Sequence, residues 1–338
     1  MSILHGIDPS HQLLLTLKNH QKLLKPGKIT WLPPMLATLT KERFSNKEWL
    51  FECKYDGIRG LVFKDGNSVK ILSRNQLDIR KNYPELLQEF LNEKTSQFIV
   101  DGEIVAFRDK ITSFSALQQR MHINKNRDLV SEIPVYFYAF DILYLDGFYL
   151  EKIPLIQRKE LLLKSLQYKE FIRYSQHILG DGIKFYQTAC QNGWEGVMAK
   201  RINSIYEHNR SSNWLKFKCG YQQEFVIGGF TLPKGARIGF GALLIGYYQN
   251  GQLKYAGKVG SGYTAVTLKE LYGALKKLEI STSPFTEPIS EHHAIWVKPT
   301  LIAEVKFTEW TKDGKLRHPT FQGLRTDKDP KEVRREME

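Results

Sequence analysis

Residues 51–60 read Phe-Glu-Cys-Lys-Tyr-Asp-Gly-Ile-Arg-Gly and contain the pattern Lys-x-Asp-Gly-x-Arg, formed by Lys54, Asp56, Gly57 and Arg59. The lysine ends an apolar strand and precedes an Asp-Gly turn. A lysine with an ordinary pKa of about 10.4 attacks nothing until it loses a proton. Burial, cations or a metal lower that pKa, and Asp56 can orient the amine or take its proton. Gly57 permits close approach, and Arg59 offers a donor fork for phosphate or ribose oxygens. Alone, the pattern is also common on solvated turns.

Further segments follow this stretch in a characteristic order. They are Ser73-Arg74-Asn75, Asp101-Gly102-Glu103-Ile104-Val105, Tyr138-Ala139-Phe140-Asp141, Glu195-Gly196-Val197-Met198-Ala199-Lys200, Trp214-Leu215-Lys216-Phe217-Lys218, Arg317-His318-Pro319 and Gly323-Leu324-Arg325-Thr326-Asp327-Lys328. The ordered set is far more specific than any single motif. It resembles the covalent nucleotidyltransferases and is most similar to ATP-dependent DNA ligases. Among these, the ligase module of bacterial DNA ligase D and related end-joining ligases are the best match.

Length and composition bound the fold. A chain of 338 residues exceeds one ordinary core, and 42% hydrophobic with 12% aromatic residues suffices for packed domains. We expect an α+β protein with an N-terminal helical extension (1–28). The resemblance implies an adenylation domain of antiparallel sheets with flanking helices (29–220), followed by an OB-fold barrel (221–338). The boundary is placed at Cys219-Gly220-Tyr221.

Periodicity predicts the individual elements. His11 to Leu24 forms a candidate amphipathic helix that ends at Pro26-Gly27. Asn250-Gly251 predicts a hairpin turn. Further helices are expected at 182–192 and 267–278. Strands are expected at 49–54, 61–63, 98–107, 135–145, 225–230, 242–248, 253–259 and 301–310.

Charge and cysteine content narrow the function classes. The net charge of +13 favours a polyanionic partner, and both 1–220 and 221–338 carry positive excess. The cysteines, Cys53, Cys190 and Cys219, form no Cys-x-x-Cys, which argues against a disulfide framework or zinc module. We expect them to be small buried residues. No signal peptide or membrane span is visible, so the bacterial cytoplasm is expected, with a monomer as the default.

The resemblance implies roles for the basic residues of the fifth segment. If Trp214–Lys218 is a strand, Lys216 and Lys218 share one face while Leu215 and Phe217 point into the core. The resemblance places both lysines at the nucleotide α-phosphate, where they neutralise developing charge. The alternative interpretation is a half-exposed strand whose lysines simply lie in solvent.

The resemblance also assigns the remaining nucleotide contacts. It makes Phe140 the platform for adenine, Val197 the opposite wall, and Glu52 the residue that reads the adenine amino group. Arg59 and Arg74 are candidates for phosphate contact. Glu103 is expected at the ribose or a metal, and Glu195 at Mg²⁺ or Mn²⁺, which prefer oxygen ligands.

Two features concern the later segments. Arg325, Asp327 and Lys328 are implied to reach the β- and γ-phosphates when the barrel closes over the nucleotide. Asn209-Arg210-Ser211 replaces the usual Gly-Arg-Ser, and because Asn tolerates a left-handed backbone, the turn can persist.

The resemblance implies an ATP-dependent DNA ligase that seals 5′-phosphate/3′-hydroxyl nicks or breaks through AMP on Lys54, as in DNA repair by end joining. The end-binding Ku protein and separate end-processing enzymes are candidate partners, although no residue supports them. Three alternatives share parts of the pattern. An RNA ligase would use the same lysine, a capping guanylyltransferase would use GTP, and a DNA-binding scaffold would need none of Lys54, Glu195, Lys216 and Lys218.

Overall fold

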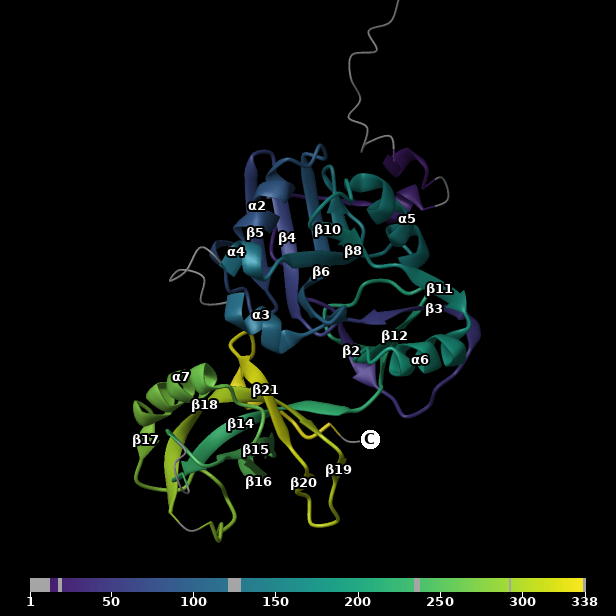
Figure 1. Cartoon of the computed structure of the whole chain (residues 1–338). Helices are drawn as coiled ribbons and strands as arrows, with labels where there is room; N and C mark the ends of the chain where they lie inside the picture. Colours follow the sequence, from purple (N-terminus) through teal and green to yellow (C-terminus); the bar gives the residue numbers. More distant parts are fainter. Residues whose placement is uncertain (1–12, 18–19, 121–128, 234–237, 292, 337–338) are drawn as a thin grey trace, which may run out of the picture. The chain divides into compact units, whose positions relative to one another are not determined.

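The computed structural model describes residues 13–17, 20–120, 129–233, 238–291 and 293–336. Chain contacts divide it into two compact units, Met1–Cys219 and Gly220–Glu338 (Figure 1). The division lies one residue from the expected boundary. The N-terminal segment is not a unit of its own, because its leucines join the core of the first unit.

One sheet of the first unit carries the turn that follows Lys54. Its strands are β1 (Lys25–Pro26), β4 (Ile58–Asp65), β5 (Ser68–Ser73), β6 (Gln97–Arg108), β7 (Ile111–Thr112), β8 (Val135–Leu145), β9 (Phe148–Tyr149) and β10 (Ile172–Tyr174). The order is β1-β9-β8-β6-β4-β5, with β10 beside β8 and β7 beside β6. Pairing is antiparallel except between β8 and β10. The apolar strand β8 occupies the predicted range and is largely buried, as a central strand requires.

A second sheet presents Lys54 itself. Its strands are β2 (Leu36–Leu39), β3 (Asn46–Lys54), β11 (His177–Gly180), β12 (Gly196–Arg201) and β13 (Arg210–Lys218). The order β11-β3-β12-β13-β2 places β12 between β3 and β13. Strand β2 runs parallel to β13, and the other neighbours are antiparallel. Three motif segments that are distant in sequence therefore lie on adjacent strands.

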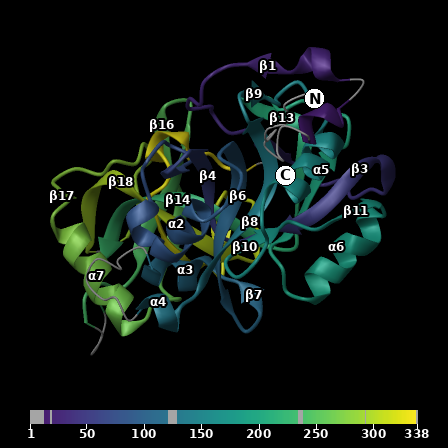
Figure 2. The ribbon, with the colours of Figure 1, turned by 90° about the horizontal axis from the view of Figure 1, so that it is seen from above.

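Helices cover these sheets. They are α2 (Pro84–Leu91), α3 (Phe114–Arg120), α4 (Leu129–Glu132), α5 (Leu155–Ser165) and α6 (Gly182–Gln191), with 3-10 turns η1 (Gln21–Leu23) and η2 (Arg80–Asn82). Helix α6 packs on β3, β11 and β12, and α6, β3 and β11 lie together in Figure 2. Helix α5 packs on β8. The predicted helix at 182–192 is confirmed.

The N-terminal prediction is only partly met. Leu14 and Leu17 are buried against the first core as the pattern suggested. The described part of 11–24 is nevertheless not one helix. Leu13–Leu15 are helical, with backbone bonds from the Thr16 amide to Leu13 and from the Leu17 amide to Leu14, and the separate 3-10 turn η1 follows. A segment this short is marginal as an isolated helix, so burial of its leucines decides its shape. His11, Gln12, Lys18 and Asn19 lie outside the described residues.

The second unit is built on another curled sheet. Its elements are β14 (Tyr221–Thr231), β15 (Leu243–Gln249), β16 (Gln252–Val259), α7 (Ala265–Lys276), β17 (Glu279–Ile280), β18 (Ala294–Phe307), β19 (Glu309–Trp310), β20 (Leu316–Arg317), β21 (Thr320–Arg325) and η4 (Pro330–Glu332). The order is β16-β15-β14-β18-β17, with β21 also on β18. A bridge from Ser261 to Thr320 brings the end of β16 to β21.

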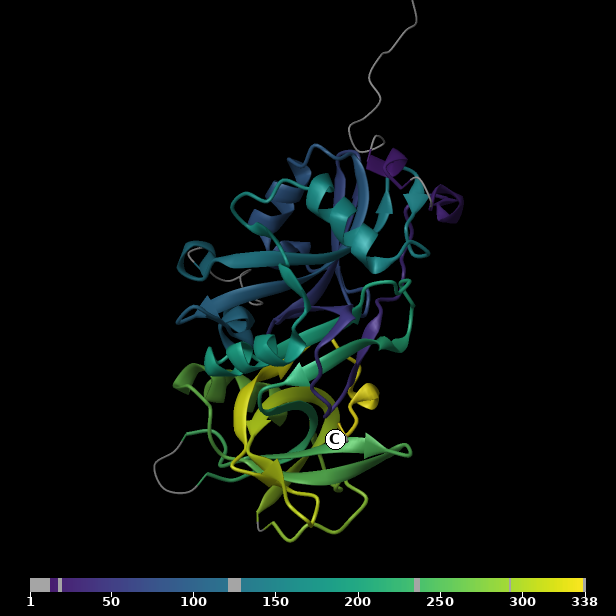
Figure 3. The same ribbon diagram turned by 90° about the vertical axis from the view of Figure 1, so that its right-hand side faces the viewer.

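The strands of this unit therefore wrap around a common interior, as Figure 3 shows, and the architecture is that of the expected OB fold. Asn250 and Gly251 both have positive φ (51° and 76°) in the predicted hairpin turn. Helix α7 starts at a capping box in which Thr264 accepts from the Thr267 amide, and it buries Leu271 and Leu275.

The expectation for the cysteines is corrected at two positions. Cys190 and Cys219 form a disulfide, with their Cα atoms 5.2 Å apart. Cys190 belongs to the last turn of α6, and Cys219 follows β13. Because α6 packs on the strand next to β13, the two ends meet, which spacing along the sequence could not reveal. Cys53 is half-buried and is a free thiol.

Candidate active site

Lys54 ends β3, and strand pairing places other charged candidates beside it on the same face of the sheet. Gly196 on β12 pairs with both Lys54 and Lys218. One step along, Met198 pairs with both Glu52 and Lys216. Side chains two apart on a strand share a face, so these two rows lie on one surface of the sheet.

The opposite face is apolar. Phe51, Val197 and Phe217 are fully buried there, and Leu215 packs against them. The predicted alternation of Lys216 and Lys218 with Leu215 and Phe217 is therefore confirmed. It also corrects the role expected of Val197, which points into this core. Met198, half-buried beside Glu52 and Lys216, occupies the position that was assigned to Val197.

The Lys54 ammonium forms an ion pair with Glu195, the residue that precedes β12. Burial alone would lower the pKa of Lys54, but the charge and hydrogen bond of Glu195 outweigh it, and Asp56 and Glu103 add to the effect. The pKa of Lys54 is consequently raised. This corrects the expectation of a lowered pKa, because the nearest groups are carboxylates rather than cations. Lys54 is protonated in this arrangement, and a nucleophilic role would require that Glu195 release it.

The turn after Lys54 is fixed by Asp56 and Gly57. The Asp56 amide donates to Thr112 Oγ1 (3.1 Å), and its carboxylate accepts from the Phe114 amide at the start of α3 (3.1 Å). Asp56 thus anchors the turn as well as adding charge near Lys54. A Cβ on Gly57 would lie 2.2 Å from the Ile104 carbonyl oxygen, so only glycine lets β4 start this close to β6.

Arg59 uses its donor fork within the protein. Nε and Nη2 donate to the two carboxylate oxygens of buried Asp101 at 2.7 and 2.5 Å. Tyr206 also donates to Asp101, at 2.6 Å, and burial with the Asp101 charge raises the Tyr206 pKa. The Arg59 guanidinium lies 4.9 Å from the centre of the Phe140 ring. The structure thus brings Arg59 to the expected base platform but commits two of its nitrogens to Asp101.

Glu52 is the centre of a buried ion triad that sequence reasoning missed. It is 1% exposed, and its two oxygens accept from Lys159 (2.5 Å) and Lys200 (2.6 Å). Burial would raise the pKa of Glu52, but the two ammoniums lower it below its ordinary value. The Lys200 ammonium also lies 4.3 Å from the centre of the Phe140 ring and 4.2 Å from that of Trp214. A signal for Lys200 existed, since it alternates with apolar Val197 and Ala199.

The remaining candidates of the first unit lie on neighbouring strands. Glu103 on β6 pairs with Arg59 on β4 and contributes to the raised pKa of Lys54. Arg74 is half-buried and directly follows β5, whose last residue pairs with Gly60. Asn209 does not take a left-handed backbone. Its carbonyl accepts from the Leu36 amide (2.9 Å) just before β13 begins, so the turn needs no glycine.

In the second unit, Arg325 and Lys328 are engaged in ion pairs. Arg325 donates to Asp327 (2.9 and 2.8 Å) and to Glu304 (3.3 Å), and Lys328 pairs with Glu224. Asp327 is 3% exposed, and although burial would raise its pKa, Arg325 holds it below the ordinary value. To make the expected phosphate contact, Arg325 would have to break its ion pairs with Asp327 and Glu304.

The candidate metal ligands fit a divalent ion only in part. No three His, Cys, Asp or Glu side chains converge on one point within the described residues. Glu103 and Glu195 both act on Lys54 and supply the oxygen donors that Mg²⁺ prefers. Because Mg²⁺ commonly takes one or two carboxylates and completes its shell with water and substrate phosphate, these residues fit such a shared site.

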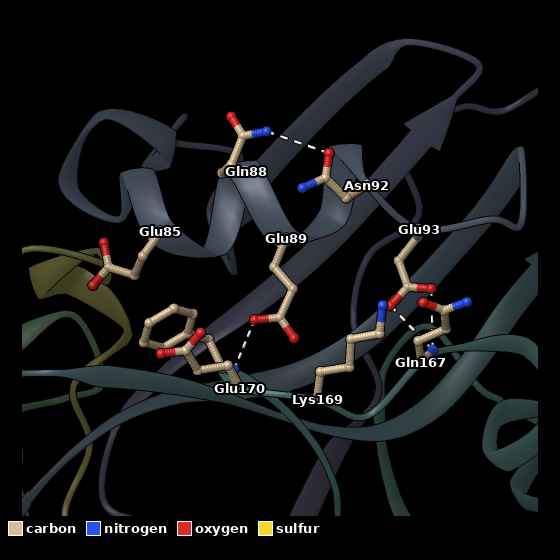
Figure 4. Close-up of a pocket in the computed structure, with 9 residues that line it drawn as sticks. Glu85, Gln88, Glu89, Asn92, Glu93, Gln167, Lys169 and Glu170 are labelled. Atoms are coloured by element: carbon tan, nitrogen blue, oxygen red, sulfur yellow. Dashed lines mark hydrogen bonds between the residues drawn. The ribbon is translucent and has the colours of Figure 1, made fainter.

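An acidic pocket of about 310 Å³ lies elsewhere in the first unit, between α2 and the segment before β10 (Figure 4). Three of its four glutamates have structural partners, and the first of them, Glu85, pairs with Arg120. Glu89 accepts from the Phe171 and Ile172 amides, and Glu93 from the Gln167 amide. These bonds tie α2 to the segment leading into β10, so the pocket lacks the chemistry found around Lys54. No helix among the described residues is long and apolar enough to cross a membrane.

Comparison with known proteins places the chain. Residues 34–218 match the family described as ATP dependent DNA ligase domain, and residues 236–328 match the ATP dependent DNA ligase C terminal region. The multifunctional non-homologous end joining protein LigD of Mycobacterium bovis is 38% identical over 327 residues, which are 95% of this chain and 42% of that protein. LigD of Pseudomonas aeruginosa is 35% identical over 312 residues, 90% of this chain and 36% of that protein.

A solved structure, mycobacterial DNA ligase D complexed with ATP and MES, matches with a TM-score of 0.65 and 35% identity, covering 89% of this chain and 97% of that one. The chain spans less than half the length of the curated relatives named above. Both family regions occur in their expected order, and the ordered motifs lie within them. The chain therefore belongs to the ATP-dependent DNA ligase family.

Proposed function

We propose that the chain is an ATP-dependent DNA ligase that joins a 5′-phosphate to a 3′-hydroxyl through an AMP group carried on Lys54. The observation that carries the proposal is the shared face of β3, β12 and β13. There Lys54, Lys216 and Lys218 lie in adjacent rows, with Glu195 paired to Lys54. Three ammoniums beside one carboxylate suit a polyphosphate that enters between them.

In the first step, the Lys54 amine, after losing its proton, attacks the α-phosphorus of ATP. A P–N bond forms, the bond from the α-phosphorus to the bridging oxygen breaks, and pyrophosphate leaves. Lys216 and Lys218 stabilise the charge on the α-phosphate oxygens. A divalent ion such as Mg²⁺ or Mn²⁺, when bound by Glu103 and Glu195, would supply further charge neutralisation.

In the second step, an oxygen of the DNA 5′-phosphate attacks the AMP phosphorus, the P–N bond breaks and Lys54 recovers its proton. In the third, the 3′-hydroxyl oxygen attacks the activated 5′-phosphate, AMP leaves and the hydroxyl proton goes to solvent. The covalent intermediate divides one difficult condensation into displacements with good leaving groups.

Recognition of adenine is assigned to Glu52, Lys200, Phe140 and Met198. Glu52 accepts from the amino group and Lys200 donates to ring N1, while Phe140 and Met198 face the ring. The burial of Glu52 supports this assignment, because a mismatched base would leave a buried polar group unpaired. Arg74 is assigned to phosphate contact. Arg325 and Lys328 are assigned to the β- and γ-phosphates.

DNA end joining is the proposed setting, supported by the names of the LigD relatives and by the net charge of +13. A Ku-type end-binding protein is the corresponding candidate partner. The test is sealing of a nicked duplex with a 5′-phosphate, prepared in all-DNA and all-RNA form, with ATP and Mg²⁺. We expect sealing of the DNA duplex and none by Lys54→Ala, while Lys70→Ala, an exposed lysine on β5, remains active. Sealing of the all-RNA duplex alone would contradict the proposed DNA ligase activity and indicate RNA ligase activity instead.

A further inference from the structure

Lys159 is fixed in a position from which it touches Glu52. It lies on α5, is 1% exposed, and donates to Glu52 Oε1 (2.5 Å) and to the Ser175 carbonyl oxygen (2.9 Å). Its ammonium also lies 4.3 Å from the centre of the Tyr174 ring. With two acceptors and a ring face around it, the side chain has one arrangement that satisfies its charge.

Helix α5 is itself anchored next to this lysine. Arg158 donates to both oxygens of Asp141 on β8, at 2.7 and 2.9 Å, and all these atoms are buried. The helix cannot shift without breaking a second buried ion pair, which is costly. Lys159 is therefore presented to Glu52 by a rigid support that includes no residue assigned to the nucleotide.

The two lysines of the triad differ in what else they face. Lys200 lies against the rings of Phe140 and Trp214, on the side assigned to the base. Lys159 is held on the far side by Ser175 and Tyr174. Lys200 can thus turn toward a ligand, whereas Lys159 remains with Glu52.

We propose that Lys159 is a positioning residue that keeps Glu52 an ionised, correctly aimed acceptor and thereby sets the preference for ATP over GTP. The inference rests on the proposed function, because it needs a nucleotide at Glu52. Lys159 itself contacts no nucleotide group and acts only through the carboxylate.

The chemistry of the two bases explains the effect. Adenine offers an amino donor at C6, which an ionised carboxylate accepts, since the carboxylate has about four acceptor sites and the lysines use two. Guanine offers an oxygen at C6, which an ionised carboxylate repels. A protonated carboxyl could donate to that oxygen, and burial without Lys159 favours the protonated form. Removing Lys159 should therefore weaken ATP use and relax discrimination against GTP.

The test compares transfer of AMP and GMP from labelled ATP and GTP to the full chain. For Lys159→Met we expect the ATP-to-GTP ratio of kcat/KM to fall about tenfold or more, mainly through a higher KM for ATP, because Lys54 is untouched. Lys159→Gln, which keeps a donor for Ser175 but no charge, should behave alike and serves if the Met variant fails to fold. Lys164→Met is the matched control, since it removes a lysine from the exposed side of the same helix and should leave the ratio unchanged.

A double-mutant cycle separates positioning from a general structural effect. In a Glu52→Gln background, Lys159→Met should change the ratio no further. A wild-type ratio in folded Lys159→Met and Lys159→Gln, or an equal loss in the Glu52→Gln background, would overturn the inference. Its failure is distinguishable from that of the proposed function, because AMP transfer to Lys54 of the wild-type chain is measured first, and without that transfer there is no ratio to compare.

Discussion

Lys54 and Glu195 form an ion pair between the end of β3 and the residue that precedes β12. Gly196, next in sequence to Glu195, is the register partner of Lys54, so the pair is a consequence of sheet register. The carboxylate holds the amine protonated, although the proposed reaction needs it neutral. The same carboxylate is the candidate metal ligand. A group that draws Glu195 away would therefore help to release the nucleophile.

Replacing Glu195 should expose the effect of burial on Lys54. In Glu195→Gln the main cause of the raised pKa is gone while burial remains, so the pKa of Lys54 should fall. The measurement is the rate at which an amine-reactive acylating reagent modifies Lys54 as a function of pH. Peptide mass analysis reads the modification, and exposed Lys70 serves as the internal reference. The inflection should move to lower pH, and an unmoved inflection would contradict the role given to Glu195.

The same ion pair has a defined effect on stability. Because the folded pKa of Lys54 is raised, the contribution of the pair is fully present below its unfolded pKa of about 10.4. It is lost as the pH rises through the folded pKa. The difference in unfolding free energy between wild type and Glu195→Gln should therefore be flat from about pH 6 to 9 and shrink only at higher pH.

Met198 and Val197 should give opposite phenotypes. Met198→Ala removes a side chain on the face of Glu52 and Lys216, so the KM for ATP in AMP transfer should rise several-fold. Val197→Ala opens a cavity beside Phe51 and Phe217 and should cost about 1–2 kcal/mol of unfolding free energy, with the KM for ATP unchanged. Steady-state transfer assays and denaturant unfolding measure both quantities. The reverse pattern would mean that Val197, and not Met198, lies on the face with Glu52 and Lys216.

Arg325 should matter strongly for the stability of the second unit. Arg325→Met leaves Asp327 and Glu304 buried without their cation, which should cost about 3–5 kcal/mol. Arg317→Met breaks an exposed pair with Glu309 and should cost less than about 1 kcal/mol. Denaturant unfolding of the full chain compares the two variants.

The pH dependence of the Arg325 effect follows from the lowered pKa of Asp327. Stability from this pair is present above the unfolded pKa of about 3.9 and is lost as the pH falls through the folded pKa. The cost of Arg325→Met should thus shrink at acidic pH. A cost equal to that of Arg317→Met at neutral pH would show that the buried network contributes little.

Part of this site could be read from the sequence, and part could not. The alternation around Lys216 and Phe217 fixed which lysines share a face, because strand geometry is local. The place of Lys159 in the triad at Glu52 could not be predicted, since Lys159 reads as an ordinary lysine on a helix until α5 is packed on β8. The face of the sheet on which Val197 lies depends on the pairing of Gly196 with Lys54. That pairing is a property of the assembled sheet and not of the local sequence.

A simple thiol count tests the disulfide between Cys190 and Cys219. Denatured, non-reduced chain should show one reactive thiol, that of Cys53, and three after reduction. Burial, with the charge of Glu195, raises the pKa of Cys53 to about 12, so it should react slowly in the folded chain near pH 8. With the bonded cysteines separated by 29 positions in the sequence, Cys190→Ser should cost about 3–4 kcal/mol. Three thiols without reduction would refute the disulfide.

The most direct measurement is incubation of the purified chain, freed of any bound AMP, with α-labelled ATP and Mg²⁺, beside α-labelled GTP, followed by intact mass and peptide mapping. Wild type should gain one AMP on Lys54 from ATP and none from GTP, and Lys54→Arg should gain nothing. An adduct from GTP alone, or on another lysine, would contradict the assignment. No adduct on a folded sample would contradict the covalent mechanism itself.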